Sequence, residues 1–367
     1  MQIKAAVLYE PNTPLVIETV DLDEPNDEEV LVRVVSAGVC YSDYHVMKGE
    51  WTMPLPMVLG HEAAGIVEKT GAGVTRVAPG DHVILNFRAN CGTCRHCVVG
   101  RPVLCTGVDT PRWFMFDGTS RLHKGGQDIH HFTRTACFAE YAVVPESGAV
   151  PVRKDMPLDP ASLVGCAVMT GVGAVINTAK VEPGSSVLVI GCGGIGLNVI
   201  QGAVLAGAER IIAVDTLQNK LSYAREFGAT DTLAASDGDV VARVRELTGG
   251  GVDYAFEAIG NPKTIHQAYE ATGPGGTTVV VGMAPETDEI SLNALSLPRT
   301  EKVLMGSWYG SARPWVDFPM LVNLYMSGRL KIDPMISRTY RLAEINDAYE
   351  ALARGEVARS VIVFDRS

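Results

Sequence analysis

A short apolar strand that runs directly into a glycine-rich turn constrains the fold of this chain more than any other feature. The strand is 187–190, and the turn reads Gly-Cys-Gly-Gly-Ile-Gly over 191–196, ahead of a helical segment. In such a unit the first glycine permits a tight turn, the second lets the backbone approach a pyrophosphate, and the third lets the helix pack closely on the strand. The helix N-terminus then faces the phosphates. The pattern predicts a dinucleotide site that includes Gly191, Gly193, Gly194 and Gly196.

The acid at the end of the next strand predicts which dinucleotide binds. The strand 211–214 ends at Asp215, nineteen residues after Gly196. A carboxylate there accepts hydrogen bonds from both ribose hydroxyls of NAD and repels the 2′-phosphate of NADP. We therefore expect NAD as the cofactor.

The order of elements along the chain predicts an α/β protein with two domains. From about Pro183, apolar strands at 187–190, 210–214, 254–257 and 277–281 alternate with helical segments at 197–206, 218–227, 239–248 and 264–271. That alternation is typical of a doubly wound parallel sheet. The first third reads as short β-strands, and the tail as two helices and a final strand. We expect an irregular β domain formed by 1–168 and 308–367, with the nucleotide-binding domain inserted at 169–307.

Four cysteines within fifteen residues predict a structural zinc site. Cys91, Cys94, Cys97 and Cys105 have the spacing x2, x2 and x7. Four thiolates bind zinc as a closed tetrahedron, which leaves no position for a substrate. Two intervening residues rarely allow disulfide geometry. A redox cluster or a set of reduced core thiols is the alternative.

Three further residues could form an open metal site, although their spacing does not bring them together. They are Cys40, His61 and Cys166, separated by 21 and 105 residues. Two thiolates and one imidazole would leave the fourth zinc position open. Taken singly, a lone cysteine or histidine is more often a buried structural residue.

The charge balance excludes several kinds of partner. The net charge of −11 argues against binding to nucleic acid or to an anionic membrane surface. We expect no transmembrane segment, because no run of about 18 uncharged apolar residues is apparent. The N-terminus lacks the pattern of a signal peptide. We therefore expect a cytoplasmic protein whose cysteines are reduced.

Together these motifs resemble the zinc-containing medium-chain alcohol dehydrogenases, in particular the liver-type and class III (glutathione-dependent formaldehyde dehydrogenase) branch. The resemblance covers essentially the whole chain. It includes Gly-His-Glu at 60–62, the four-cysteine loop, Asp-Gly-Thr-Ser-Arg at 117–121, Thr-Gly at 170–171, the glycine turn through Asp215, and Gly-Gly-Val-Asp-Tyr at 250–254. It implies a GroES-like catalytic domain joined to a Rossmann domain, and two zinc ions per chain.

The resemblance also implies roles around a catalytic zinc held by Cys40, His61 and Cys166. Asp43 would orient His61 through its second ring nitrogen, and Glu62 would lie close behind the metal. The metal would lower the pKa of a bound alcohol. Ser42 would take the proton, and His45 would end the relay as a surface histidine.

The implied cofactor contacts come from several parts of the chain. Lys220 would contact the adenosine ribose, Arg359 the pyrophosphate, and the backbone of Val281 the nicotinamide amide, and Thr170 belongs to the same set. Tyr41 stands where many relatives have Arg or His against the pyrophosphate.

Aromatic residues match the substrate pocket of the liver-type enzymes. Phe87, Phe132 and Thr133 would line an apolar pocket suited to medium-chain or aromatic primary alcohols, although these aromatics could simply be core residues. The long loop 108–135, rich in Gly, His and Arg, has no role assigned by sequence. The span from Cys105 to Cys166 retains the long loop that is typical of dimeric relatives. We expect a homodimer joined near the strand after Ser296.

The sequence thus predicts an enzyme that transfers hydride between a primary alcohol and NAD and yields the aldehyde. One alternative is a formaldehyde dehydrogenase that acts on a thiol adduct. A second is a nicotinoprotein that keeps NAD(H) bound. A third is a protein that binds NAD and zinc without turnover, against which the intact relay residues argue.

Overall fold

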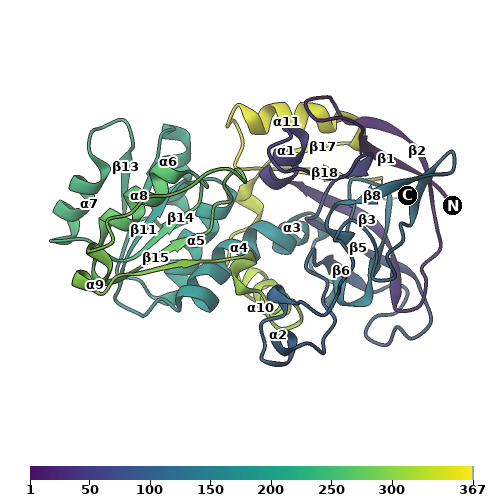
Figure 1. The fold of residues 1–367 in the computed structure, drawn as a ribbon, viewed down its shortest axis with the longest axis horizontal. Helices are drawn as coiled ribbons and strands as arrows, with labels where there is room; N and C mark the ends of the chain where they lie inside the picture. Colours follow the sequence, from purple (N-terminus) through teal and green to yellow (C-terminus); the bar gives the residue numbers. More distant parts are fainter. Residues whose placement is uncertain (366–367) are drawn as a thin grey trace. The chain divides into compact units, whose positions relative to one another are not determined.

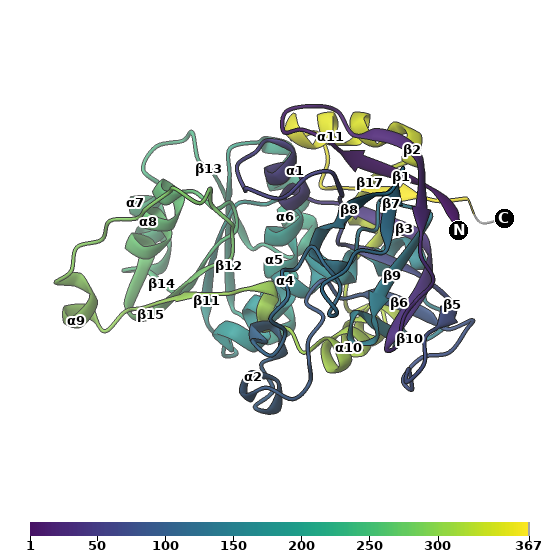
Figure 2. The ribbon, with the colours of Figure 1, turned by 45° about the vertical axis from the view of Figure 1, so that its right-hand side comes forward.

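The computed structural model describes residues 1–365 and forms two compact units. The first unit contains residues 1–166 and the segment from 313 onward, and the inserted unit contains residues 167–312. Figures 1 and 2 show the inserted unit as the teal and green part of the ribbon, with a parallel sheet and helices.

The inserted unit is built on a six-stranded sheet whose strands are all parallel. Its order is β13 (Asp231–Ala234), β12 (Arg210–Asp215), β11 (Ser186–Ile190), β14 (Val252–Glu257), β15 (Thr272–Val280) and β16 (Val303–Gly306). The connecting helices are α5 (Gly194–Ala206), α6 (Gln218–Phe227), α7 (Val240–Thr248) and α8 (Pro262–Ala271). The predicted Rossmann sheet is confirmed. The strands β12 and β13 follow on one side of β11, and β14, β15 and β16 follow on its other side, so the end of β11 is a topological switch point.

Side-chain alternation explains how this sheet is covered on both faces. Leu188 and Ile190 of β11 belong to the buried cluster that contains Val240 and Val244 of α7. The intervening residues Val187 and Val189 are also fully buried and point to the opposite face. Such strands read as continuous apolar runs, because both faces of a parallel sheet are covered.

The first unit is β-rich and combines a closed barrel with a second sheet. The barrel order is β1 (Gln2–Leu8), β2 (Val16–Leu22), β7 (Leu122–Lys124), β8 (Gln127–His131) and β4 (Met57–Val58). The sheet order is β10 (Ala149–Val152), β6 (His82–Leu85), β5 (Ala63–Thr70), β3 (Glu29–Val39), β18 (Arg359–Val363) and β17 (Ile336–Tyr340), with β9 (Tyr141–Pro145) also paired to β3. Because β18 pairs with β3, the C-terminal segment completes the sheet that the N-terminal segment began.

The first unit also contains α-helices. They are α1 (Tyr41–Met47), α2 (Arg95–Val98), α3 (Leu158–Leu163), α10 (Pro314–Met326) and α11 (Ile345–Ala353). The helix α1 begins where β3 ends, and α11 lies near β3 and packs beside β18. In Figure 1 the yellow ribbon of α11 lies beside the purple ribbon of α1.

The segment 108–135 is not simply a long loop, which corrects the sequence interpretation. It contains the hairpin β7–β8, whose strands close the barrel between β2 and β4. Within it, Arg121 donates from Nε and Nη2 to the two carboxylate oxygens of Glu29, at 2.8 and 2.7 Å, and from Nη2 to Asp117 Oδ2 at 2.5 Å. The motif 117–121 therefore contributes to an ion cluster in which Arg121 and Glu29 are buried and Asp117 is exposed.

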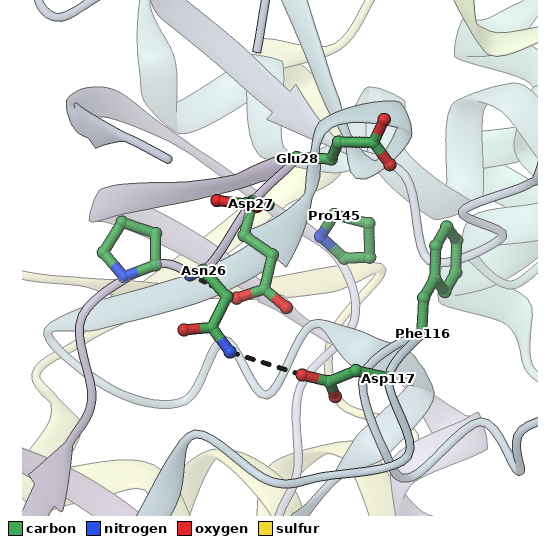
Figure 3. A pocket seen from close by; sticks show the side chains of 8 residues that line it. Asn26, Asp27, Glu28, Phe116, Asp117 and Pro145 are labelled. Atoms are coloured by element: carbon green, nitrogen blue, oxygen red, sulfur yellow. Dashed lines mark hydrogen bonds between the residues drawn. The ribbon is translucent and has the colours of Figure 1, made fainter. Parts of the chain in front are cut away.

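A surface hollow of about 590 Å³ lies beside this cluster (Figure 3). Asn26 donates to Asp117 across it at 3.3 Å, and Glu28, Phe116 and Pro145 line its rim. The carboxylates of Asp117 and Glu29, which line this hollow, are already paired with Arg121.

The helical run from 158 to 179 corrects a second expectation. Its 22 residues are long and apolar enough to cross a membrane by length and composition, although the sequence analysis found no such run. In the structure 83% of its most apolar window is buried inside the protein, which is the pattern of a core helix. Its apolar character reflects packing on all sides within the fold.

We predict that Arg121→Leu destabilises the first unit by about 3 kcal/mol, because it leaves the carboxylate of Glu29 buried without its cation. Chemical denaturation of the purified protein measures this change. The matched control is Arg33→Leu, whose partner Glu68 lies at the surface, so we expect a loss of about 0.5 kcal/mol there. Equal losses in the two variants would contradict the assignment of Arg121 as a buried structural cation.

Candidate functional site

Three residues from distant parts of the sequence meet in the interior of the first unit. Cys40 follows β3 and is the N-cap of α1, His61 lies between β4 and β5, and Cys166 lies in the helical run that follows α3. Their ligand atoms all lie within 4.8 Å of one another, and each residue is buried. The sulfur of Cys166 is 3.3 Å from Nε2 of His61. The structure thus brings together the three residues that spacing could not.

The donor set and spacing of this trio fit zinc. With Zn–S near 2.3 Å and Zn–N near 2.0–2.1 Å, a tetrahedral site separates a sulfur from a nitrogen by about 3.6 Å. The observed 3.3 Å between Cys166 Sγ and His61 Nε2 is close to that separation. Three protein ligands leave one position for water or substrate, as in catalytic zinc sites.

Asp43 fixes the orientation of the imidazole. The carboxylate of Asp43 is fully buried and lies 3.1–3.2 Å from Nδ1 of His61, and it also accepts from the amide of Gly60 at 2.8 Å. Burial alone would lower the pKa of His61, but Asp43 and Cys40 raise it well above its usual value. With Nδ1 donating to Asp43, Nε2 is the nitrogen that faces Cys166 and can bind a metal.

The tight turn before His61 depends on glycine. Gly60 has φ of +91°, and a Cβ there would lie 2.7 Å from the amide nitrogen of Phe138. Both the backbone conformation and the close packing therefore exclude a side chain at this position.

Behind the trio, Glu62 pairs with a buried arginine. Arg359 Nη1 lies 3.6 Å from Glu62 Oε2 and donates to the carbonyl of Val39 at 3.1 Å. Gly38 makes room for this carboxylate, because a Cβ at Gly38 would approach Glu62 Cδ to 2.7 Å. The guanidinium of Arg359 adds positive charge beside Cys40 and Cys166.

These neighbours favour a thiolate in the trio. The pKa of Cys40 is well below its usual value, chiefly because the thiol of Cys166 donates to it, with Arg359 and His61 adding to the effect against the cost of burial. Thiolates are the form of cysteine that binds metal.

The two residues predicted to form a proton relay share one helix, but one of them is not where the sequence interpretation placed it. Ser42 is half-buried on α1, and His45 follows three residues later on the same face. His45 is buried, only 8% exposed, rather than a surface histidine. Its ring is covered by Trp51, which stacks on it at 4.6 Å, and by the edge contact of Tyr41 at 5.0 Å. Burial of the ring follows from these aromatic contacts.

Two aromatic rings flank His61. The ring centroids of Phe87 and Phe132 lie 5.1 and 5.5 Å from that of His61, both edge-on. Phe132 is buried and Phe87 is half-buried. Thr133, next to Phe132, is half-buried with φ of +53°, and its hydroxyl lies 3.1 Å from that of Thr135. The metal trio therefore has apolar walls on two sides.

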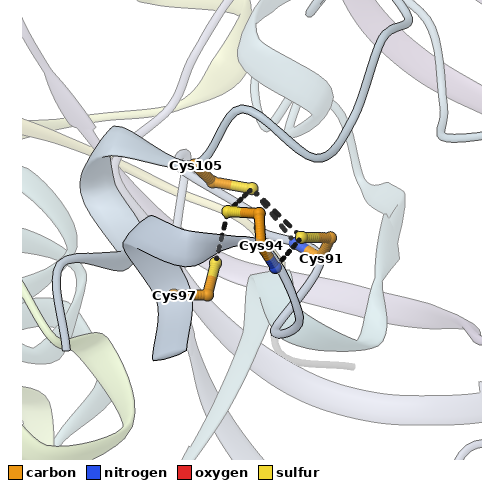
Figure 4. A group of neighbouring side chains, drawn as sticks. All are labelled: Cys91, Cys94, Cys97 and Cys105. Atoms are coloured by element: carbon orange, nitrogen blue, oxygen red, sulfur yellow. Dashed lines mark hydrogen bonds between the residues drawn. The ribbon is translucent and has the colours of Figure 1, made fainter. Parts of the chain in front are cut away.

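The four-cysteine loop forms a second metal-binding group (Figure 4). The sulfur separations are 3.6 Å for Cys94–Cys97, 3.8 Å for Cys94–Cys105 and 3.5 Å for Cys91–Cys105. A disulfide needs about 2.05 Å, whereas four sulfurs around zinc lie about 3.8 Å apart. The pKa of Cys94 is lowered to about 5, chiefly because the backbone amides of Cys97 and Thr106 donate hydrogen bonds to its sulfur. The loop fits a closed zinc site with four sulfur ligands.

The glycine turn at the end of β11 has the geometry of a phosphate-binding turn. Gly191 has φ of +95°. A Cβ at Gly196 would lie 1.7 Å from the carbonyl oxygen of Gly191, whereas a Cβ at Gly193 would meet nothing within 4 Å. Gly193 is the N-cap of α5 and offers no side-chain cap, and Gly194 is the first residue of the helix. The first amides of α5 are thus available for a phosphate.

Asp215 and Lys220 lie next to this turn. The carboxylate of Asp215 accepts from the amide of Cys192 at 2.8 Å. Burial, and next the charge of Asp215, raise the pKa of Cys192 to about 12 against the opposing charge of Lys220, which places both charges near the turn. The other carboxylate oxygen of Asp215 accepts from the amide of Leu217 at 3.0 Å, so backbone amides on both oxygens fix the acid at the end of β12.

Two other predicted cofactor residues occupy the same unit. Thr170 is buried in α4 (Met169–Gly173). The amide of Val281 donates to the backbone carbonyl of Glu257 at 2.8 Å, so Val281 has only its own carbonyl oxygen left for a cofactor amide.

Sequence reasoning missed Tyr349, a fully buried residue of α11. Burial, and next the charges of Asp43 and Cys40, raise the pKa of its hydroxyl well above the usual value. No local pattern marks a single tyrosine in an amphipathic C-terminal helix. Only the return of the chain to the first unit brings it to Asp43.

Comparison with known proteins gives the same picture over the whole chain. Residues 26–154 match the alcohol dehydrogenase GroES-like domain, and residues 194–326 match the zinc-binding dehydrogenase domain. A class-3 alcohol dehydrogenase from Cereibacter sphaeroides is 42% identical over 99% of this chain and 100% of its own length. An NDMA-dependent alcohol dehydrogenase from Amycolatopsis methanolica is 40% identical, over 99% of each chain.

A solved structure is similar over its full length as well. The benzyl alcohol dehydrogenase of Acinetobacter calcoaceticus is 34% identical with a TM-score of 0.94, and 100% of each chain is covered.

We predict that two neighbouring glycines respond differently to alanine. Gly193→Ala has room for its methyl group, so the thermal unfolding temperature stays near that of the wild type, while NADH affinity falls about tenfold because the methyl fills the space at the helix N-terminus. Gly196→Ala meets the Gly191 carbonyl and lowers the unfolding temperature. Calorimetry and NADH fluorescence titration measure the two effects. Unchanged NADH affinity in Gly193→Ala would rule out this turn as the pyrophosphate site.

Proposed function

This chain belongs to the zinc-dependent alcohol dehydrogenases, and on that premise we propose that it oxidises a primary alcohol to the aldehyde with NAD as hydride acceptor. The observation that carries the proposal is the buried trio of Cys40, His61 and Cys166, with ligand atoms within 4.8 Å and only three protein donors. A closed four-thiolate site alone would leave no position for an alcohol.

The chain's residues prepare a bound zinc for this chemistry. Zinc supplies a Lewis acid that makes an alcohol hydroxyl more acidic. Asp43 holds His61 so that Nε2 points toward the sulfur of Cys166, and Arg359 with Glu62 supports the trio from behind. Phe87 and Phe132 flank His61 and exclude water from two sides. A dry site strengthens every electrostatic interaction within it.

The proton of the alcohol leaves through α1. Ser42 is half-buried and follows the metal ligand Cys40 by two residues, so its hydroxyl is our choice for the first proton acceptor. His45, on the same face of α1, is the base that receives the proton next.

The inserted unit holds the dinucleotide in our proposal. The amides at the start of α5 bind the pyrophosphate, and Asp215 accepts from the ribose hydroxyls and selects NAD. Lys220 contacts the same ribose. The Val281 carbonyl and Thr170 serve the nicotinamide end, and Arg359 adds a contact to the pyrophosphate. NAD bound there would supply the hydride acceptor.

The walls of the trio guide the choice of alcohol. Phe87 and Phe132, with Thr133, make an apolar pocket for medium-chain or aromatic primary alcohols. A solved relative is named for benzyl alcohol. Two alternatives are supported by other relatives: one is named as an S-(hydroxymethyl)glutathione dehydrogenase and one as NDMA-dependent. The first favours a thiol adduct of formaldehyde as substrate, and the second favours a permanently bound NAD(H).

The assembly and location that we propose rest on two features. The edge strand β16 presents Val303 with 42% exposure, and exposed Leu295 and Leu297 precede it. An exposed apolar edge strand favours pairing with a second copy, which supports a homodimer. All eight cysteines are free of disulfides, which suits the cytoplasm.

A spectrophotometric assay of zinc-replete protein tests this function. We expect NADH to appear with NAD and benzyl alcohol or octanol, and turnover to fall by at least 10³-fold in Cys40→Ala, which loses a metal ligand. The panel includes ethanol and also formaldehyde with and without glutathione. A Cys94→Ala control separates loss of the catalytic zinc from loss of the other zinc.

Other outcomes decide between the alternatives. Turnover with formaldehyde only when glutathione is present would replace the free-alcohol reading. NADH already bound after purification, with turnover only on addition of an external acceptor, would identify a nicotinoprotein. No formation of NADH with any substrate of the panel would overturn the proposed function.

A further inference from the structure

The buried histidine of α1 has an acidic partner that the mechanism above does not use. Nδ1 of His45 lies 2.5 Å from Oε2 of Glu50. The imidazole is nearly buried, whereas the Glu50 side chain is 39% exposed. A base that gains a proton in a buried position needs a nearby counter-charge, because an isolated buried cation is costly.

The backbone after α1 is shaped to bring Glu50 back to His45. Gly49 has φ of +69°, which is accessible to glycine, and its amide donates to the carbonyl of Val46 at 3.0 Å. The amides of Glu50 and Trp51 then both donate to the carbonyl of His45, at 2.9 and 3.4 Å. This turn places the carboxylate of Glu50 and the indole of Trp51 against the same imidazole.

The rest of the environment holds the ring still and brings no second charge to it. Trp51 stacks on one face of the imidazole, and the edge of Tyr41 meets the ring. Tyr44 lies behind Tyr41 at 5.3 Å. Burial, and next the carboxylate of Glu50, raise the pKa of Tyr41, so this tyrosine meets His45 as a neutral phenol. Among the described contacts of His45, Glu50 is the charged one.

An ionised carboxylate only accepts hydrogen bonds, so the Nδ1 that faces Glu50 carries the hydrogen. The lone pair is then on Nε2. We propose that Glu50 is a positioning residue for the relay: it holds His45 in the Nδ1–H tautomer and stabilises the imidazolium that forms when Nε2 takes the proton of the alcohol. This inference rests on the proposed role of His45 as the base.

The proton balance is simple. One N–H bond forms at Nε2 as the O–H bond of the donor breaks, and the same proton later leaves Nε2 for water. Glu50 keeps its charge throughout, and its hydrogen bond from Nδ1 becomes charge-assisted in the imidazolium. The hydride goes to NAD, so each oxidation releases one proton.

Single-turnover oxidation of benzyl alcohol by the NAD-loaded, zinc-replete protein tests the proposal, because product release cannot mask the step. We expect Glu50→Gln to slow NADH formation about tenfold, to leave the KM of the alcohol within about twofold, and to increase the solvent deuterium isotope effect. Added imidazole buffer restores the rate in Glu50→Ala in proportion to its concentration, and Glu50→Asp recovers most of it. The matched control is Glu68→Gln, whose carboxylate is also 39% exposed and paired with Arg33.

A wild-type rate in Glu50→Gln would overturn the proposal. A slow variant that imidazole does not restore would show a merely structural role and would overturn it too. Nitrogen NMR of ¹⁵N-histidine protein gives a readout that does not depend on turnover, with His45→Asn for assignment. We expect the Nδ1–H tautomer at His45 in the wild type and its loss in Glu50→Ala, which has no acceptor for that hydrogen. An Nε2–H tautomer in the wild type would contradict the proposal. The expected tautomer together with no turnover of any alcohol would instead contradict the proposed function.

Discussion

The metal site depends on the interaction of the buried carboxylate of Asp43 with the imidazole of His61. The carboxylate is fully shielded from solvent, and it accepts from the Gly60 amide while it lies 3.1 Å from Nδ1 of His61. A buried carboxylate must be paired or hydrogen-bonded, so it fixes the turn before His61 and the tautomer of the imidazole together. Tyr349 brings the C-terminal helix to the same carboxylate. One buried anion thus joins three segments: the helix α1, the turn between β4 and β5, and the C-terminal helix α11.

The two metal groups of the first unit divide their work by ligand number. The loop of Figure 4 offers four sulfurs and closes its site, so a zinc ion there can only stabilise the loop. The trio offers three donors and leaves one position for chemistry, with Phe87 and Phe132 as walls. In our proposal the helix α1 is the route for the proton. In our proposal the inserted unit binds the other reactant, NAD, at a glycine turn that lies at a topological switch point. The metal-binding groups and the proposed dinucleotide site therefore lie in different compact units of the chain.

Local patterns were predictable from the sequence, and long-range packing was not. The turn at 191–196 and the cysteine loop at 91–105 each lie within a few residues of chain, so their geometry follows from their spacing. Cys40, His61 and Cys166 were grouped only through the family resemblance, because 105 residues separate the last two. The strands β13 and β16 are four residues long and half-buried or exposed, which leaves no clear alternation to detect. The burial of His45 was missed because it depends on the rings of Trp51 and Tyr41, and the core helix 158–179 was missed because its apolar run includes glycine, threonine and asparagine.

The central claim is that the trio holds a metal with one open position, and cobalt substitution tests it most directly. With Co²⁺ in place of zinc in a Cys94→Ser variant, the visible spectrum reports the coordination of the trio alone. The account predicts an intense tetrahedral thiolate spectrum that shifts when pyrazole or benzyl alcohol is added, and that disappears in His61→Ala. A spectrum that no added ligand alters would show a closed site, and would contradict the assignment of this centre as the place where an alcohol reacts.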